Sequence, residues 1–264
     1  MDRLRVIEEE SRRFADALAH ADEAAPVPTC PDWNARALLW HLIGVHRFWA
    51  DVLAQDPQTE EDVEALGWEG KTPPDSVADL FALREQATSD LLDQLRLLDD
   101  SAARWTWSDH DQSVGFTRRM QTYEATMHRI DAELTADRQV SRIAPDVAAG
   151  AVDHCVDVMW GLVPDWAQHE PLAVVELAAS DTGQRWLVEI RRWFGVGPES
   201  GNSYDLAWTE RIDGVEPQAI VTAVTVEQLA RWAWGRQPDP AAITIEGSEA
   251  GRDAVGRLIG QGIP

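Results

Sequence analysis

Residues 123–133, YEATMHRIDAE, place a glutamate and a histidine four positions apart. Successive residues of a helix are rotated by about 100°, so Glu124 and His128 lie about 40° apart on one helix face. This spacing allows a carboxylate and an imidazole to bind the same cation. Pairs of this kind also occur by chance on solvated helices, so the pair alone leaves both interpretations open.

A third candidate ligand, His41, lies within residues 33–53, where Leu38 and Leu42 flank it. The apolar residues of this segment recur at helical spacing, which places His41 on the face that packs into a helical core. A buried imidazole needs partners for its ring nitrogens, and these can be a metal ion or a carbonyl or hydroxyl group. His46 lies about 140° further around the helix, so one ion is not expected to bind both histidines. We choose His41.

The elements that must position these residues are helices. Hydrophobic periodicity predicts four of them, joined by two long loops over residues 56–74 and 99–116. Four helices with two long connections indicate a four-helix bundle. The expected helices span residues 3–22, 33–53, 77–98 and 118–136.

The second half of the chain has a different pattern. A helix over residues 146–163 is followed by alternating apolar runs, typical of strands, which are interspersed with two further helical segments. This order favours an α+β domain. We therefore expect an α+β protein with two domains, a helical bundle over residues 1–145 and a smaller α+β domain over residues 146–264.

The composition excludes several classes of function. The chain has 264 residues, with 46 Asp and Glu against 23 Lys and Arg, and a formal charge of −23. Such a surface repels a phosphate backbone and an anionic membrane, so neither nucleic acid nor membrane is an expected partner. The N-terminus lacks the apolar core of a signal peptide, and no apolar run is long enough to span a bilayer. We expect a soluble, cytoplasmic protein, with Cys30 and Cys155 as reduced thiols.

Other common catalytic motifs are missing from the sequence. It contains no HExxH zinc-protease motif, no phosphate-binding loop and no Gly-x-Ser-x-Gly nucleophile elbow. His41, Glu124 and His128 are therefore the main candidates for a chemical function.

The sequence resembles a known family. The segment VPTCPDWNARALLWHLIGVHRFWA, followed by DQSVGFTRRMQTYEATMHRIDAE, is similar to the mycothiol-dependent maleylpyruvate isomerase family, whose N-terminal domain is a DinB-like metal-binding bundle. The later VTAVTVEQLARWAWGR and ITIEG resemble the C-terminal domain of that family, which has a sterol-carrier-like fold. The resemblance covers nearly the whole chain.

The resemblance implies a divalent metal, usually zinc, held by His41, Glu124 and His128. It also implies mycothiol as a cofactor, a low-molecular-weight thiol that is activated for isomerisation of a small electrophilic substrate or for S-transfer to it. A His₂Glu site also accepts nickel, iron or manganese, so the identity of the metal is open. The oligomeric state is open too.

Four further residues are candidates for the site. Asp131 lies three residues after His128 and can orient it, although a solvated helix charge is an equal alternative. Arg129 can bind an anionic group and Trp107 can form the wall of a cofactor pocket, but a surface ion pair and a core position are their ordinary roles. Arg236, in WAWGR, resembles a family arginine that reaches the active site from the second domain.

The chain departs from the family pattern at Tyr123, where many members have a histidine directly before the glutamate. Tyr123 is expected to point about 100° away from Glu124, which leaves the three ligands intact but can change the pocket wall. Two other functions remain open: a noncatalytic protein that binds a metal or ligand, and a structural dimerisation module with an empty site.

Overall fold

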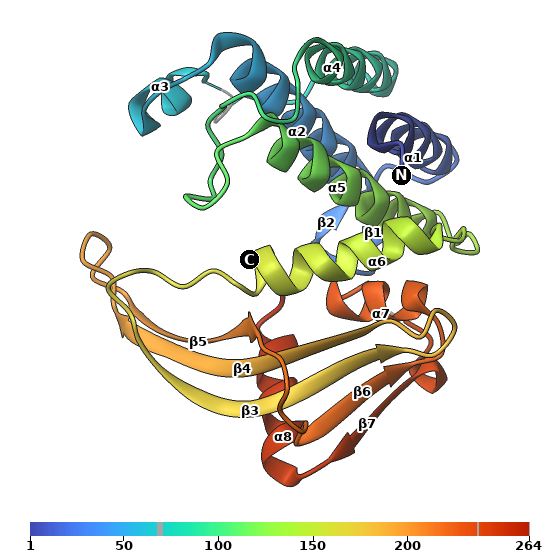
Figure 1. The fold of residues 1–264 in the computed structure, drawn as a ribbon. Coiled ribbons are helices and arrows are strands. Elements are labelled where there is room, and N and C mark those ends of the chain that lie inside the picture. Colours follow the sequence, from blue (N-terminus) through green and yellow to red (C-terminus); the bar gives the residue numbers. More distant parts are fainter. Residues whose placement is uncertain (68–70, 237, 264) are drawn as a thin grey trace. The chain divides into compact units, whose positions relative to one another are not determined.

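The computed structural model describes residues 1–67, 71–236 and 238–263. The chain divides into two units, Met1–Ser141 and Arg142–Pro264, where the sequence suggested a division between residues 145 and 146. The first unit is helical and the second contains a sheet with helices (Figure 1). The expected α+β fold, a bundle followed by an α+β domain, is confirmed.

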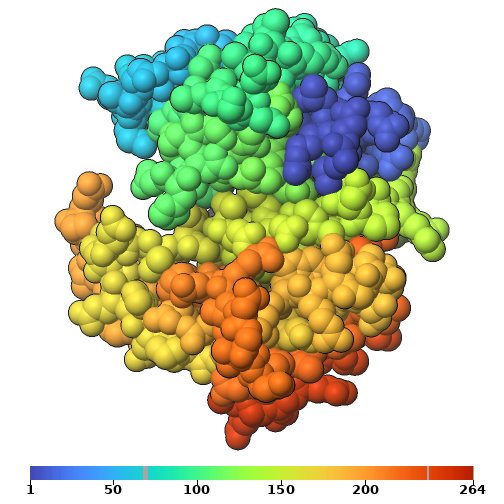
Figure 2. Space-filling view, viewed as in Figure 1, coloured from blue at the N-terminus to red at the C-terminus, as the bar shows by residue number. Residues whose placement is uncertain are grey.

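Four long helices form the first unit: α1 (Arg3–Leu18), α2 (Ala35–Gln55), α4 (Val77–Leu97) and α5 (Val114–Thr135). Helix α1 lies along α5, and α2 lies along α4. Apolar side chains of these helices form a buried core, and the first unit is the blue-to-green part of the surface in Figure 2. All four helices begin at a side-chain cap that accepts a hydrogen bond from a backbone N–H of the first turn; the caps are Asp2, Asn34, Ser76 and Ser113.

Helix α5 is buried on nearly all sides although many of its residues are polar. Buried polar groups are costly unless they are paired, so this helix must direct each of them to a partner. The expected start at residue 118 is too late, because Ser113 caps the helix and adds a full turn before it.

Three short elements of the first unit were not expected from the sequence. Strands β1 (Pro26–Val27) and β2 (Cys30–Asn34) pair before α2, and α3 (Glu60–Ala65) lies in the expected loop over residues 56–74. Helix α3 is too short to show a helical period, and a capping box between Thr59 and Asp62 supports it. Residues 68–70 of that loop lie outside the described residues.

The second unit is built on a five-stranded sheet with the strand order β5-β4-β3-β6-β7. Strands β3 and β6 are parallel and the other neighbours are antiparallel. The strands are β3 (Gln168–Ala179), β4 (Arg185–Val196), β5 (Ser203–Arg211), β6 (Ala219–Ala223) and β7 (Ile243–Gly247).

Helices pack against this sheet. The unit begins with α6 (Pro145–His154), which continues as a π-helical turn η1 (Cys155–Met159). Trp186 of β4 donates a 2.8 Å hydrogen bond to Asp153 of α6, which ties that helix to the sheet. Helix α6 also packs on α7, and both α7 and α8 contact β3. The remaining helices are α7 (Val226–Ala233), the 3₁₀ turn η2 (Pro240–Ala242) and α8 (Glu249–Gly260).

Within the described ranges, no helix combines the length and the apolar character needed to cross a membrane.

Candidate metal centre

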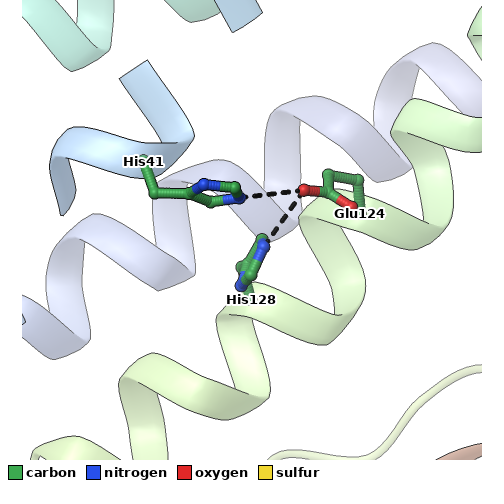
Figure 3. Close-up of side chains that lie close together, drawn as sticks. All are labelled: His41, Glu124 and His128. Atoms are coloured by element: carbon green, nitrogen blue, oxygen red, sulfur yellow. Dashed lines mark hydrogen bonds and ion pairs between the residues drawn. The ribbon is translucent and has the colours of Figure 1, made fainter. Parts of the chain in front are cut away.

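Three side chains from two helices converge in the first unit. Oε1 of Glu124 lies 3.3 Å from Nε2 of His41 and 3.0 Å from Nε2 of His128 (Figure 3). One ligand atom from each residue lies within 4.8 Å of the other two. Ligands around a tetrahedral zinc ion are separated by roughly 3.3 Å, so the two nitrogens and the oxygen fit a divalent cation with only small adjustments.

The arrangement follows from helix geometry. Glu124 and His128 share one face of α5, as their four-residue spacing predicts. Helix α2 crosses α5 so that His41 points toward the same place (Figure 3). Two rigid helices therefore fix all three donors, and no loop residue is needed for their convergence.

The charges in the cluster are strongly coupled. Burial raises the pKa of Glu124, but the charge of His128 and the hydrogen bonds from both histidines outweigh it, so the pKa lies well below its ordinary value. Burial lowers the pKa of His128, but the charge of Glu124 and the hydrogen bonds to Asp131 and Glu124 raise it to about 9. The Nε2 proton of His128 lies where the three ligand atoms converge, so a divalent cation would take the place of this proton.

Asp131 is fully buried and contacts His128 directly. Its Oδ2 atom lies 2.8 Å from Nδ1 of His128, and its Oδ1 atom accepts a 2.6 Å hydrogen bond from the Thr29 hydroxyl. A carboxylate on the outer nitrogen of a histidine fixes the orientation of the ring and directs the other nitrogen toward a metal. Asp131 therefore has the position of an orienting residue, and Thr29 holds it there.

A cavity of about 490 Å³ opens beside His41. The Trp33 ring lies over the cluster, with its centroid 4.6 Å from that of His41 and 6.3 Å from that of His128. The cavity is lined by Trp33, Ala37, Trp40, His41, Gly44, Val45, Phe48 and Trp49.

The second histidine of α2 has a different environment. His46 is fully buried, and its Nδ1 lies 3.0 Å from the hydroxyl of Thr88. That hydroxyl donates to the carbonyl of Arg84, so His46 carries its proton on Nδ1 and donates to Thr88. Burial lowers the pKa of His46 to about 3, which keeps the ring neutral.

Arg129 is not brought to the cluster. It is fully buried and donates to Glu10 at 2.6 Å, to Glu133 at 2.8 Å and to the Ser141 carbonyl at 2.7 Å. These bonds engage its Nε and Nη1 atoms and the whole side chain is buried, so Arg129 links α5 to α1 rather than facing the cluster.

Trp107 lies one helical turn from the cluster rather than in the cavity wall. Its Nε1 contacts the sulfur of Met120 at 3.1 Å, and its ring packs edge-on against Phe116. Met120 precedes Glu124 by four residues on α5, so Trp107 supports the helix face that carries the ligands.

Arg236 lies in the second unit, directly after α7, where it donates to the Trp234 carbonyl at 2.7 Å. A role in the site stays a prediction from the resemblance. Tyr123 points to the first helix of the bundle, where its hydroxyl accepts a 3.1 Å hydrogen bond from Arg3. It is not among the residues that line the cavity.

The sequence did not single out Thr29, Trp40 or Phe48 as site residues. A signal existed for the aromatic pair, because Trp40 and Phe48 lie one residue before and seven residues after His41, on one side of the same helix. No local pattern could identify Thr29, whose contact with Asp131 joins residues 102 positions apart.

The N-terminal part of the chain is similar in sequence to a known domain. Residues 4–133 match the family model described as the mycothiol maleylpyruvate isomerase N-terminal domain. This part of the chain is therefore similar to that domain family. The family resemblance seen in the sequence is confirmed.

Two solved structures share the fold over both units. One is a mycothiol-dependent maleylpyruvate isomerase, with a TM-score of 0.60 and 14% identity. The other is a histidine-to-alanine mutant of a protein described in the same words, with a TM-score of 0.61 and 13% identity. Each alignment covers 95% of this chain and 92% of the other. No curated protein matches the chain in sequence.

Proposed function

We propose that this protein is a metal-dependent enzyme that activates a low-molecular-weight thiol, mycothiol, for isomerisation of a small electrophilic substrate or for S-transfer to it. The convergence of His41, Glu124 and His128 carries the proposal, because these side chains meet within a domain of the isomerase family. The similar solved enzymes are mycothiol-dependent isomerases, which supports the thiol and the reaction class.

The donor set suits this chemistry. Two neutral imidazoles and one carboxylate would hold a divalent cation, most simply zinc, with net positive charge. When bound, such a cation lowers the pKa of a coordinated thiol so that the thiolate is present at neutral pH.

The protein's own groups supply orientation and access. Asp131 keeps the proton on Nδ1 of His128 and leaves Nε2 for the metal. Trp33 covers one side of both imidazoles and restricts water on that side. The cavity beside His41 is the side from which a thiol or a substrate can approach.

Isomerisation and S-transfer begin with the same bond. In both, the thiol gives up its proton and its sulfur adds to one carbon of a substrate double bond, while the other atom of that double bond takes up a proton. In isomerisation the new carbon–sulfur bond later breaks and the thiol is recovered, whereas in S-transfer the bond remains and the thiol is consumed. Arg236 is proposed to assist from the second unit, as the family resemblance implies.

The first test is the metal content of the purified full-length protein. We expect near-stoichiometric divalent metal in the wild type, and the elemental spectrum identifies it. His41→Ala and Glu124→Ala should each lose the metal, because two ligands do not retain it. His20→Ala is the matched control, since His20 lies at the exposed end of α1 and should keep the metal. Wild-type protein that holds no metal after incubation with zinc would overturn the proposal.

The second test measures turnover by the metal-loaded protein. An uncharged cis-enol ester is followed for isomerisation, and a soluble electrophile is followed for conjugation with mycothiol. We expect activity that requires the thiol and disappears in Glu124→Ala. Binding of metal and thiol without turnover of either substrate would favour the noncatalytic binding protein.

A cytoplasmic location and the absence of a nucleic-acid partner stay predictions from the acidic composition.

A further inference from the structure

One face of α2 forms a continuous apolar cleft, which we name the α2 cleft and define by the eight residues that line the 490 Å³ cavity. Its helical members recur every three or four residues, so they share one side of the helix. The first is Ala37 and the last are Phe48 and Trp49. Ala37 and Phe48 are eleven positions apart on the helix, which corresponds to roughly 16 Å and makes the cleft elongated.

The Ala37 end of the cleft lies beside the candidate metal centre. His41 lines it and also lies 3.3 Å from Glu124, so a ligand in the cleft would have one end beside the metal donors. Trp33 forms the wall at this end and lies over the imidazole of His41.

The other end of the cleft is aromatic and firmly packed. The centroid of the Phe48 ring lies 5.2 Å from that of Trp49 and 6.1 Å from that of Trp105. Trp105 stacks on Trp49 at 6.0 Å behind the cleft. Because three rings brace one another, this end presents a preformed apolar wall.

The lining has very little polar character. Apart from His41, only indole N–H groups are polar among its eight residues, and none of the eight is Lys, Arg, Asp or Glu. Beyond the metal centre at the His41 end, a carboxylate in the cleft would have no Lys or Arg of the lining beside it, in a protein of net charge −23. A sugar would stack on the tryptophans but would leave most of its hydroxyl groups unpaired. An uncharged apolar group gains from burial without either cost.

We propose that the α2 cleft binds the substrate, and that this substrate is an uncharged, elongated, apolar molecule with its electrophilic carbon at the His41 end and its apolar group against Phe48 and Trp49. The claim that this ligand is a substrate rests on the function proposed above. The claim that the cleft binds an uncharged, apolar ligand is independent of that function.

The test measures equilibrium binding by calorimetry with two unreactive compounds of one shape. 2-Acetylnaphthalene is neutral, and 2-naphthoate has a carboxylate in place of the acetyl group. The full-length protein is used as wild type and as Glu124→Ala. Glu124 does not line the cleft, so this variant removes the metal and retains the apolar wall. We expect the neutral compound to bind both the wild type and Glu124→Ala. In Glu124→Ala, the affinity for the neutral compound should exceed the affinity for the naphthoate by about tenfold or more.

The variants target Val45, in the middle of the cleft. Val45→Asp places a charge in the apolar wall and should weaken binding of the neutral compound about tenfold or more. Val45→Ile should change it by less than about threefold, because it stays apolar. Val215→Asp adds the same charge at an exposed position outside the cleft and should have no effect. Phe48→Leu is a second cleft variant and should weaken binding about threefold or more by removing a ring.

Several results would overturn the proposal. One is unchanged binding in both Val45→Asp and Phe48→Leu. Another is tighter binding of the naphthoate than of the neutral compound by Glu124→Ala. A third is displacement of the neutral compound by mycothiol in Glu124→Ala, which would assign the cleft to the thiol. A protein that retains no metal but binds the neutral compound would refute the proposed enzyme and leave the cleft as a binding site.

Discussion

Two pairs of residues on α5 have the same spacing and opposite roles. Glu124 and His128 are four residues apart, and so are Arg129 and Glu133. Both pairs join a carboxylate to a cationic or ionisable side chain, and both lie in the most buried helix of the bundle. From the local pattern alone they are equivalent.

The partners from other elements make the difference. Arg129 is enclosed by Glu10, Glu133 and a carbonyl, so its charge is matched inside the protein. The donors of the other pair converge with His41, beside a cavity. A closed network of charges contributes to folding, whereas a convergent set with an open side is suited to binding. We therefore expect changes in the first pair to alter stability and changes around the second to alter metal affinity.

The largest effect is expected at the closed network. Arg129→Met removes the buried cation, so that Glu10 keeps only its partly exposed contact with Arg13 and Glu133 keeps only its hydrogen bonds from Ser141. The free energy of unfolding should fall by about 3–5 kcal/mol, as measured by urea denaturation. Arg138→Met breaks the more exposed contact with Asp16 and should cost less than about 1 kcal/mol. Equal effects of the two substitutions would show that the network is not closed.

The next largest effect is expected on the metal affinity of the cluster formed by His41, Glu124 and His128. Asp131→Asn keeps the shape of the side chain but weakens its hold on His128. Zinc affinity, measured by competition with a chromogenic chelator, should fall about 10- to 100-fold. Thr29→Val removes only the hydroxyl that contacts Asp131 and should cause a smaller loss. An unchanged affinity in Asp131→Asn would show that this carboxylate serves folding, as Arg129 does.

The contrast recurs on α2, between His41 in the cluster and the enclosed His46. Charged groups of other helices face His46, namely Glu124 and His128 of α5 and Arg84 of α4. Burial nevertheless holds its pKa at about 3, below the ordinary 6.5. The unfolded chain therefore takes up this proton first as the pH falls, and stability is lost from about pH 6.5 downward. One proton corresponds to about 1.4 kcal/mol per pH unit, or about 2 kcal/mol between pH 7 and pH 5.

Denaturation of wild type and His46→Leu at several pH values measures this loss. The variant should lack the part of the pH dependence that His46 supplies, while His20→Ala should keep it, because His20 is exposed. Identical slopes in wild type and His46→Leu would contradict the enclosed environment.

The smallest effect is expected at Gln121, on α5 one turn before the cluster. Its side chain is fully buried, and within the part of the chain that the structure describes neither amide atom has a hydrogen-bond partner. Gln121→Leu should raise the free energy of unfolding by about 1 kcal/mol, because an unsatisfied polar group is removed. Gln112→Leu should lower it, since Gln112 bonds to the backbone of Thr106 and Ser108. A decrease in Gln121→Leu would show that its amide is satisfied.

The sequence predicted the fold and the positions of the candidate ligands well, because both depend on local helical periodicity. The spacing of Glu124 and His128 determines that they share a face, and the apolar register of α2 distinguishes His41 from His46. The structure brings the three side chains together as that register requires. That they hold a metal stays a prediction.

The sequence could not indicate which charged residues are enclosed. Arg129 follows His128 directly, and its partner Glu10 lies 119 positions away, so only the packing of α1 on α5 reveals its role. The α2 cleft was missed for a related reason. Aromatic residues at helical spacing are typical of a core, and only the packed bundle shows that Trp40 and Phe48 border a cavity.

The separation of the ligands along the chain also has a kinetic consequence. His41 and Glu124 are 83 residues apart, and Thr29 and Asp131 are 102 residues apart. Contacts that close such long loops form late in folding, after the local turns and helices. The cluster of His41, Glu124 and His128 should therefore be completed when α2 finally docks on α5. Binding of a coloured cation such as Co²⁺ during refolding would then report the rate of this last step.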